Sequence, residues 1–342
     1  MELLLTKNPI VEPIGLRSTK DLVVKHINNA TSFNIATGFI TNDSIAELQS
    51  IVSYKKNSMN LLLFIGMNYL DGFTKIQYNA VRELNDMLHE YNSGKVYLSP
   101  KALFHGKMYS FSNQASCLGS FVGSSNLGSF LDKNASYIES DIYFDGNEGL
   151  GINQNISKII NCLGQEFDDV PIITKFKTPE FKVLKGYDHV TEVSKDQIDE
   201  YKDMRTGVIV HMPFKTDPKS NLNTYFGAGK IKNRYSPRGW YEVELILNKD
   251  TDAANILPTG KSFTVVADDG YSFNLSRQGD YNKNLRSDSN LKILGRWIKG
   301  RMENYGALEI GKPVTEETIK RFGKSQMVFE ETKSGIWLLS MK

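Results

Sequence analysis

The spacing of apolar residues changes its character once along this chain, and that change limits the folds it can adopt. Up to about Glu166, short apolar runs such as residues 60–67 alternate with stretches of helical period such as residues 74–91. Beyond about Tyr201 the pattern consists mostly of short strand-like runs separated by Gly, Asn and Asp. Strands alternating with helices are typical of a layered α/β domain, and closely spaced short strands of a small barrel. We therefore expect two domains of different fold class.

Turn and helix signals predict the elements of each part. In the first part we expect strands at about residues 33–40, 60–67, 103–111, 115–122 and 137–144, and helices at about residues 18–30, 42–53, 74–91 and 151–163. In the second part we expect strands at residues 240–247, 262–267, 271–275 and 335–339, a hairpin turn at Asp269-Gly270, and helices at residues 290–302 and after Thr315. Leu294 and Trp297 are expected in the core. The predicted division is an α/β domain over residues 1–168, a linker over residues 169–197 and a β-rich domain over residues 198–342.

Charge is distributed unevenly between the two parts. Residues 1–170 carry 13 Lys and Arg against 17 Asp and Glu, and residues 171–342 carry 28 against 22. An excess of positive charge in one domain indicates a surface for a polyanion such as nucleic acid. The longest apolar run, residues 61–67, is far too short to span a membrane, and two cysteines form neither a disulfide framework nor a zinc site. We expect a cytoplasmic protein without a membrane partner.

The stretch that predicts chemistry lies in the first part. Residues 104–109 read FHGKMY, and residues 119–126 read GSFVGSSN. Positions two apart in a strand face the same way, so the imidazole of His105 and the ammonium of Lys107 would lie side by side, directed at one anion. On the next strand, glycines allow a close approach of the backbone, and hydroxyl and amide groups offer contacts to phosphate oxygens. The pattern predicts a site built around one phosphate group.

These residues resemble the HxK…GSxN signature of the phospholipase D superfamily. The resemblance implies that His105 is the nucleophile that attacks phosphorus and forms a phosphohistidine intermediate. It implies that Lys107 and Asn126 hold the non-bridging oxygens and stabilise the charge that develops there, with Ser124 beside the same phosphate. For the fold it implies a layered mixed sheet with helices on both faces.

One position departs from the pattern of this superfamily. The usual motif has an Asp five residues after the Lys, and that position here is Ser112, so the usual support behind the His–Lys pair is absent. In many members a carboxylate a short way downstream orients the histidine. Glu139 is the first candidate for that role and Asp141 the second, and the sequence leaves the choice open.

The number of motifs predicts the oligomeric state. The chain has five histidines, and only His105 lies in a His-x-Lys context. The chemistry of the superfamily uses two histidines, one as nucleophile and one to protonate the leaving oxygen. A single motif therefore implies a homodimer through the amino-terminal domain, with one active site shared across a two-fold axis. No group of His, Asp and Glu has metal-ligand spacing, so we expect a metal-independent chemical step without other cofactors.

Two segments of the second part combine basic residues with amides. They are residues 221–238 and 276–286, and both flank predicted strands. Arg, Lys, Asn and Gln pair with base edges and phosphates, although the same composition is also typical of solvated turns. The candidate DNA contacts are Asn221, Asn223, Lys230, Lys232, Asn233, Arg234, Arg238, Arg277, Gln278, Asn282, Lys283 and Arg286.

A second resemblance covers the same part of the chain. Residues 263–273, 278–280 and 290–297 are similar to the carboxy-terminal half of certain type II restriction endonucleases. That half is similar to the DNA-binding pseudobarrel of plant transcription factors. Together with the first motif, the chain resembles the NgoFVII/NgoAVII-type restriction enzymes and, more distantly, the BfiI type. The resemblance implies a type II restriction endonuclease of a restriction–modification system, whose second domain binds specific double-stranded DNA and whose first domain hydrolyses it.

Two other functions stay open. A phosphatidyl hydrolase or transferase would use the same motif on lipid, although the chain has neither a membrane segment nor a basic amphipathic helix. A DNA-binding regulator with an inactive nuclease domain would use only the second domain, although the proposed catalytic residues are all present.

Two further expectations concern partners and control. Some relatives act with a separate ATPase or helicase-like subunit, and because this chain contains no Walker sequence, any ATP dependence would come from that other polypeptide. The acidic run at residues 166–169 raises the hypothesis that the start of the linker occupies a basic groove and inhibits the enzyme until target DNA binds.

Overall fold

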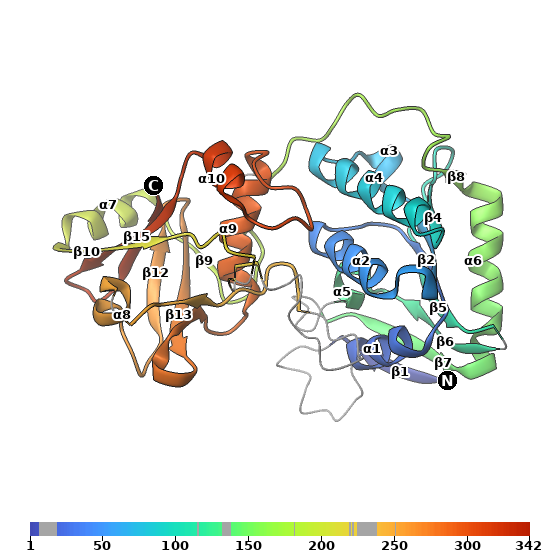
Figure 1. Cartoon of the computed structure of the whole chain (residues 1–342), viewed down its shortest axis with the longest axis horizontal. Helices are drawn as coiled ribbons and strands as arrows, with labels where there is room; N and C mark the ends of the chain where they lie inside the picture. The colour runs from blue at the N-terminus through green and yellow to red at the C-terminus, as the bar shows by residue number, and fades with distance from the viewer. Residues whose placement is uncertain are drawn as a thin grey trace. The chain divides into compact units, whose positions relative to one another are not determined.

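Two sheets organise the chain, each in a unit of its own (Figure 1). One unit comprises Met1–Pro179 with Gly229–Gly239 and is termed the first domain; the other comprises Glu180–Ala228 with Trp240–Lys342 and is termed the second domain. The computed structural model describes residues 1–6, 19–114, 116–131, 138–180, 182–218, 220, 222–223, 238–249 and 251–342.

The first domain has a mixed sheet with the strand order β1-β7-β6-β5-β2-β3-β4-β8 among its described residues. The neighbours β2, β3 and β4 are parallel, and the remaining pairs are antiparallel. The strands are β1 (Glu2–Leu5), β2 (Ser32–Thr37), β3 (Asn60–Ile65), β4 (Gly94–Leu98), β5 (Lys107–Ser112), β6 (Cys117–Gly123), β7 (Ser140–Asp145) and β8 (Gln165–Glu166).

Helices cover both faces of this sheet, which confirms the predicted layered α/β class (Figure 1). On one face, Ile156 and Ile160 of α6 pack against Ala36 and Phe64. The opposite face is covered by helices that include α1, α2 and α4. The helices are α1 (Thr19–Asn29), α2 (Asn42–Lys55), α3 (Asn68–Asp71), α4 (Lys75–Glu90), α5 (Leu127–Leu131) and α6 (Leu150–Leu163).

Local sequence explains where the longer helices begin. The side chains of Thr41 and Thr74 accept hydrogen bonds from the backbone N–H groups of Ser44 and Gln77, whose own side chains bond back to the capping residues. These reciprocal bonds satisfy N–H groups that the first turn of a helix leaves unpaired. The helices predicted at residues 42–53 and 74–91 are thereby confirmed to within a few residues.

Aromatic rings fill the layer between the sheet and α1. Phe33 stacks on Phe111 with ring centroids 4.1 Å apart. His26 of α1 stacks on the other side of this cluster at 5.3 Å from Phe111, and its Nε2 lies 3.0 Å from the hydroxyl of Tyr143. Burial lowers the pKa of His26 from its ordinary value of 6.5 to about 4, because a charged imidazole would lose its hydration there.

The second domain has a curled sheet with the strand order β10-β15-β16-β12-β13-β14-β11, and β9 pairs with β13 (Figure 1). β12 and β16 run parallel and the other pairs antiparallel. The strands are β9 (Thr191–Glu192), β10 (Arg205–Pro213), β11 (Leu245–Ile246), β12 (Phe263–Ala267), β13 (Tyr271–Gln278), β14 (Asn284–Ser287), β15 (Gln326–Thr332) and β16 (Trp337–Met341).

Helix α9 supplies much of the core of the second domain. Leu294, Trp297, Ile298 and Met302 are all fully buried, as predicted for the first two. The hairpin predicted at Asp269-Gly270 joins β12 to β13, so the β-rich class of this domain is confirmed. The helices are α7 (Lys195–Asp203), α8 (Asp252–Ile256), α9 (Lys292–Asn304) and α10 (Glu316–Phe322). No helix within the described ranges is long and apolar enough to cross a membrane.

Three expected elements differ from the structure. The sequence predicts one strand over residues 103–111, but β5 begins only at Lys107. Of the strand predicted at residues 240–247, only Leu245–Ile246 pairs with a neighbour. The range predicted as a linker contains β9 and the start of α7, because residues 191–192 pair with β13 of the second domain.

The buried histidine predicts how the stability of the first domain responds to acid. Between pH 6.5 and 4 the unfolded chain binds a proton at His26 that the folded chain does not, so acid favours unfolding. At about 1.4 kcal/mol per pKa unit, the loss is up to about 3 kcal/mol. His26→Phe keeps a ring at this position and should make the fall in unfolding free energy shallower over this range, as measured by urea denaturation. Parallel pH profiles of the variant and the parent would contradict this account.

Candidate active site

The predicted catalytic residues lie at one end of the central strands in the sheet of the first domain. This row of strand ends is termed the active-site edge. In the register of β2 with β5, Thr37 lies opposite Lys107, and in that of β6 with β7, Gly123 lies opposite Asp141. Because β5 and β6 are antiparallel, the start of β5 and the end of β6 lie at the same edge. β3 runs parallel to β2 and ends there as well. The edge therefore collects residues from five neighbouring strands.

His105 lies just before β5, in a segment that crosses the ends of β2 and β3. The N–H of Phe104 donates to the carbonyl oxygen of Gly66 at 3.1 Å. A Cβ on Gly66 would lie 2.3 Å from the carbonyl oxygen of Phe104, and one on Gly38 would lie 3.2 Å from Cα of His105. The crossing therefore excludes a side chain at Gly66, and one at Gly38 would require the His105 segment to move by a few tenths of an ångström. Sequence reasoning missed both glycines; the available signal is a Gly directly after each of two parallel strands.

The side chains of His105 and Lys107 lie against each other. Nζ of Lys107 is 3.1 Å from Nε2 and 3.3 Å from Nδ1 of His105, and it donates to the His105 carbonyl oxygen at 2.7 Å. The imidazole is exposed, whereas Lys107 is only 8% exposed. The predicted side-by-side placement is observed, but it arises at the entry to β5 and not from alternation within a strand.

The charge of Lys107 is partly stripped of water. Burial lowers the pKa of its ammonium, and the charge of Glu139 opposes that shift. Among the described residues, Lys107 forms no ion pair with a carboxylate. A cation in this state attracts an incoming anion more strongly than a fully hydrated one would.

Neither candidate carboxylate bonds to His105 within the described parts of the chain. Glu139 accepts a hydrogen bond from the hydroxyl of Ser124. Asp141 accepts from the hydroxyl of Ser125 at 2.6 Å and from its N–H at 3.3 Å. What contacts the imidazole is the ring of Phe39, edge-on with centroids 5.7 Å apart. The two carboxylates thus bond to the turn formed by Ser124 and Ser125, which is termed the serine turn. The imidazole contacts an aromatic side chain instead.

Contacts with Tyr109 hold the turn after β6 in place. Ser125 is fully buried, and its carbonyl oxygen accepts from the hydroxyl of Tyr109 at 2.7 Å. Tyr109 in turn stacks on Phe130 at 3.7 Å. The carbonyl of Asn126 accepts from Phe130 N–H in the first turn of α5, while its side-chain oxygen is buried without a partner among the described residues. Sequence reasoning overlooked Ser125 because it falls between two motif positions.

Ser112 stands where the superfamily usually has Asp. It ends β5, at the opposite end of the strand from Lys107, and lies opposite Ser32 in the register with β2. Position 112, where the superfamily usually has the supporting Asp, therefore lies away from the His105 ring. Around that ring, Gly38 and Phe39 provide the contacts.

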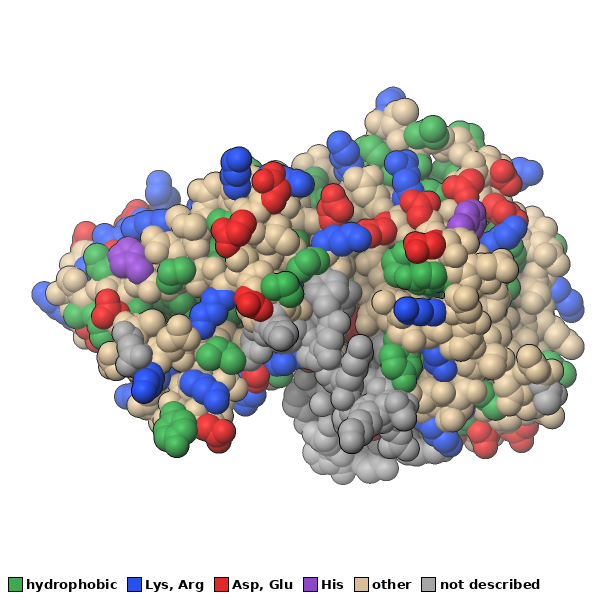
Figure 2. Space-filling model, viewed as in Figure 1, with side chains coloured by type: hydrophobic (Ala, Val, Ile, Leu, Met, Phe, Trp, Pro, Cys, Tyr) green, Lys and Arg blue, Asp and Glu red, His purple; other side chains and the backbone are tan. Residues whose placement is uncertain are grey.

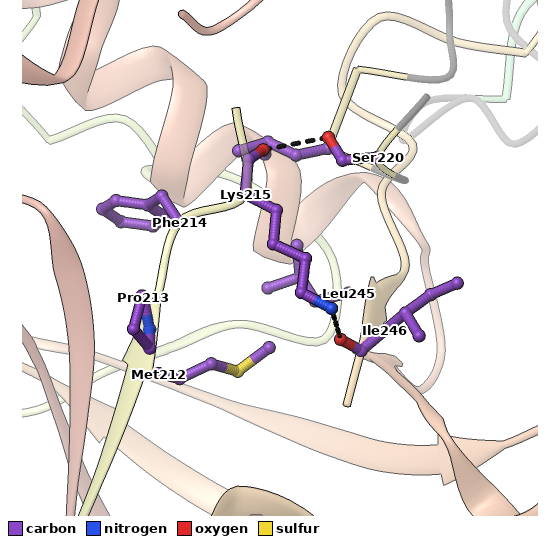
Figure 3. A pocket seen from close by; sticks show the side chains of 8 residues that line it. Met212, Pro213, Phe214, Lys215, Ser220, Leu245 and Ile246 are labelled. Carbon is purple, nitrogen blue, oxygen red and sulfur yellow. Dashed lines mark hydrogen bonds between the residues drawn. The ribbon is translucent and has the colours of Figure 1, made fainter. Parts of the chain in front are cut away.

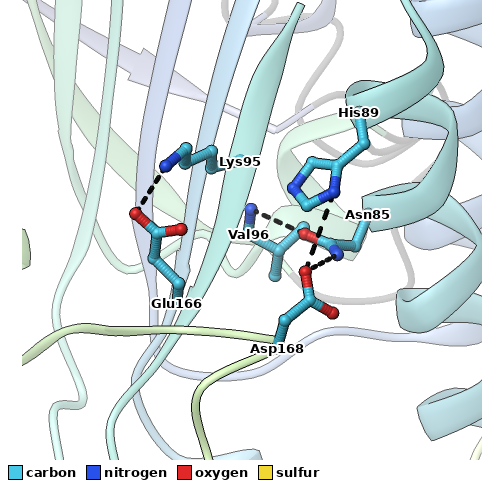
Figure 4. Close-up of polar contacts among 6 residues, drawn as sticks. All are labelled: Asn85, His89, Lys95, Val96, Glu166 and Asp168. Atoms are coloured by element: carbon cyan, nitrogen blue, oxygen red, sulfur yellow. Dashed lines mark hydrogen bonds and ion pairs between the residues drawn. The ribbon is translucent and has the colours of Figure 1, made fainter. Parts of the chain in front are cut away.

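The acidic run at residues 166–169 binds its own domain (Figure 4). Glu166 of β8 forms an ion pair of 2.6 Å with Lys95 of β4. Asp168 accepts from the side-chain amide of Asn85 at 3.0 Å and lies 3.7 Å from Nδ1 of His89. These contacts engage two of the three carboxylates of the run, with β4 and α4 of the first domain, and Asp169 is exposed, so inhibition by this run stays a hypothesis.

The candidate DNA contacts of the second domain fall into four groups by their place in the structure: outside the described residues, exposed, half-buried and buried. Asn221, Lys230, Lys232, Asn233 and Arg234 lie outside the described residues. Gln278, Asn282 and Lys283 are exposed on the hairpin between β13 and β14. Arg238 is half-buried, and Arg286 is half-buried in an ion pair with Glu244 at 2.9 Å.

Two of the candidates are corrected by their burial. The amide nitrogen of Asn223 donates to the carbonyl oxygen of Val314 at 2.9 Å, and its oxygen accepts from Val314 N–H at 2.8 Å, so the fully buried side chain joins distant segments. Arg277 is 6% exposed and donates only to backbone carbonyl oxygens. Neither side chain presents its donors to DNA, and both stabilise the domain.

The second domain has a small pocket whose lysine is already engaged by the domain's own contacts. This pocket is lined by apolar side chains and by Lys215, whose ammonium is bound to the carbonyl oxygen of Ile246 at 2.6 Å (Figure 3). On the face drawn in Figure 2, Lys and Arg are interspersed with Asp and Glu. Within the part of the chain that the structure covers, no three His, Cys, Asp or Glu side chains group as metal ligands.

Comparison with solved structures gives weak likenesses. Nuc from Salmonella typhimurium, a phospholipase D family member, is 16% identical, with 48% of this chain and 97% of that chain covered and a TM-score of 0.35. NucT from Helicobacter pylori is 17% identical, with 48% and 99% covered and a TM-score of 0.31. TrmBL2, an archaeal chromatin protein, is 10% identical, with 48% and 53% covered and a TM-score of 0.30. At such scores these likenesses carry no argument about function. No curated protein matches the chain.

Family models match both domains. Residues 18–170 match the NgoFVII restriction endonuclease N-terminal PLD domain, where PLD stands for phospholipase D. Residues 200–333 match the NgoFVII C-terminal B3-like DNA-binding domain. The two matches follow one another in the order of that family and together span most of the chain. The chain therefore belongs to the NgoFVII family of restriction endonucleases and is a DNA-hydrolysing enzyme with a phospholipase D-type nuclease domain and a B3-like DNA-binding domain.

Proposed function

We propose that the first domain hydrolyses DNA phosphodiesters through a phosphohistidine, with His105 as the nucleophile. The observation that carries this proposal is the contact of 3.1 Å between the exposed imidazole and the buried ammonium of Lys107. An anion that reaches the ammonium is thereby brought within reach of a ring nitrogen. Positioning of this kind replaces a bimolecular encounter by a reaction between held groups.

Lys107 and Asn126 stabilise the phosphate in this proposal. A negative charge that grows on the non-bridging oxygens interacts more strongly with a partly desolvated ammonium than with a hydrated one. Burial lowers the pKa of Lys107, and the charge of Glu139 opposes this shift by favouring the protonated ammonium. Glu139 and Asp141, bound to Ser124 and Ser125, keep the serine turn and the following Asn126 at the same edge.

The reaction proceeds in two displacements. A nitrogen of one His105 bonds to phosphorus while the bond to the leaving oxygen breaks, and a second, protonated imidazole gives its proton to that oxygen. Water then attacks phosphorus, the bond to nitrogen breaks, and the second imidazole takes a proton from the water. Because the chain has one His-x-Lys motif, the second imidazole is His105 of another copy.

Exposed apolar side chains beside the site support a homodimer. Leu103, two residues before His105, is 61% exposed, and Ile138, next to Glu139, is 49% exposed. Ile142, near the start of β7, is 39% exposed. Large exposed apolar side chains that neighbour site residues along the chain are consistent with a surface that another molecule covers. We propose that a second copy covers them and brings the two active-site edges together.

The second domain selects the DNA. We propose that the segments at residues 221–238 and 276–286 read a duplex sequence, supported by the exposure of Gln278, Asn282 and Lys283. In this division the nuclease belongs to the first domain and the recognition segments belong to the sequence predicted as residues 198–342, while residues 180–197 of the predicted linker are part of the second domain. We further propose that the chain acts in the cytoplasm, without metal or other cofactor, and that any ATP-hydrolysing subunit is a separate chain.

Replacing the nucleophile tests the chemistry. His105→Ala should lower the rate of plasmid cleavage on the order of a thousandfold or more, because no other described imidazole lies at this edge, while DNA affinity in a gel-shift assay stays within about twofold. His89→Gln, which removes a histidine elsewhere in the domain, should leave cleavage unchanged. Cleavage by His105→Ala at the parent rate would sink the mechanism.

Removal of divalent ions tests the proposed independence from metal. Cleavage should continue within about twofold of its rate in excess EDTA, because the site derives its positive charge from Lys107 and not from an ion. The measurement is the initial rate of plasmid cleavage with EDTA and with magnesium. An enzyme that cuts only with magnesium, with DNA binding unaffected, would rule out this proposal.

Replacing exposed apolar residues near the site by charged ones tests the dimer. The double variant Leu103→Asp with Ile138→Asp should shift the mass measured by light scattering from dimer to monomer, because unpaired carboxylates resist burial, and cleavage should fall with it. Ile172→Asp is the matched control, since Ile172 is 74% exposed but lies beyond β8. A parent that is monomeric when bound to DNA and still cuts would refute the shared site.

A further inference from the structure

The hairpin between β13 and β14 presents an aromatic side chain to solvent. Tyr281 at its tip is 96% exposed, the highest value among the large apolar side chains described. The ring therefore contributes almost nothing to the core, although tyrosine is among the side chains that gain most from contact with a partner. The hairpin belongs to the segment at residues 276–286, to which DNA reading is assigned above.

The backbone at the tip adopts an uncommon conformation. Tyr281 has a φ of 57° and Asn282 a φ of 52°, and Gly279, two residues before Tyr281, also has a positive φ of 74°. Side chains other than that of glycine rarely adopt this region, and an aromatic residue does so less readily than asparagine. Such a conformation persists only where surrounding contacts enforce it, and it is found most often at functional positions.

Arg277 supplies these contacts. Its Nε donates to the carbonyl oxygen of Asn282 at 2.9 Å, and its Nη1 donates to the carbonyl oxygens of Ala254 and Leu257 at 2.9 and 2.8 Å. The guanidinium thus ties the strained tip to α8 and the residue that follows it. A second tie is the N–H of Leu247, which donates to the carbonyl oxygen of Lys283 at 2.8 Å. The tip is held in one conformation before any ligand binds.

The charges at the tip favour contacts with bases over contacts with phosphates. Between Gln278 and Lys283 there is one acidic residue, Asp280, and one basic residue, Lys283, and all of these side chains are exposed. A segment with balanced charge gains little from the phosphate backbone, whose attraction grows with each cation. An aromatic ring between amide side chains suits the edges of bases, including the methyl group of thymine.

We propose that Tyr281 is a sequence-determining contact of the recognition domain, and that Arg277 is the positioning residue that presents its ring to a groove of duplex DNA. The proposal rests on the DNA-reading role assigned above to residues 276–286. It assigns the buried Arg277 a task that does not require it to touch DNA. Because the tip is preformed, binding needs less ordering of this segment, which favours affinity for the matching sequence.

The test is a binding selection with the full-length chain carrying His105→Ala, from a pool of duplexes with a randomised central segment. Tyr281→Ala should lose the base preference at one or two adjacent positions of the motif that the parent selects, and should bind that motif at least roughly tenfold more weakly. Its affinity for a duplex without the motif should not change. Tyr281→Phe should behave as the parent, because the ring remains.

Two further variants separate contact from positioning. Arg277→Met keeps the length of the side chain but removes its donors, and it should lose preference at the same positions as Tyr281→Ala, with no additional loss in the double variant. Tyr305→Ala removes another exposed tyrosine of the domain, 67% exposed, and should select the parent motif. Thermal unfolding identifies an Arg277→Met protein that fails to fold, in which case the Tyr281 variants decide the result.

Each outcome of the selection decides between the proposals. If Tyr281→Ala selects the parent motif with the same preference at every position and equal affinity, the role of Tyr281 is overturned while DNA reading by the domain stands. If Arg277→Met folds and retains full preference, the positioning role is overturned. If the parent selects no motif, the DNA-reading role of the segment fails, and this inference fails with it.

Discussion

The active-site edge depends on the ammonium group of Lys107, which is held largely out of water. An imidazole lies against this ammonium, and among the described residues no carboxylate forms an ion pair with it. Lys107 would be costly in this position in a protein that never met an anion, because a buried charge without a partner opposes folding. In the function proposed above, a phosphate supplies the missing partner. On that proposal, binding of substrate should stabilise this part of the first domain.

The sheet gives this edge its geometry. Strands that run in both directions place the beginnings of β5 and β7 beside the ends of β2, β3 and β6, so side chains far apart in sequence share one edge. Glu139 and Asp141 bond to Ser124 and Ser125, and among the described residues neither of them bonds to His105.

Much of this organisation could be predicted because it follows from short-range patterns. Helical patterns in the sequence located α2 and α4, and the two motifs predicted that His105, Lys107 and Asn126 belong to one site. The entry to β5 could not be predicted, since it depends on a hydrogen bond between Phe104 and Gly66, which belong to different elements. The burial of Asn223 and Arg277 was also missed, because polar composition does not reveal that the partners are carbonyl groups far along the chain.

The crossing in front of β2 and β3 has a consequence for how the chain can vary through descent. At Gly66 even one methyl group would collide with the carbonyl oxygen of Phe104, next to His105, whereas at Gly38 the nearest atoms lie 3.2 Å from an added Cβ and would have to move only slightly. Gly66 has no functional group to offer, yet selection should guard it as strictly as the imidazole. Among homologous sequences, how freely a position near the site can be substituted would then depend more on the free space around its backbone than on whether its side chain is reactive.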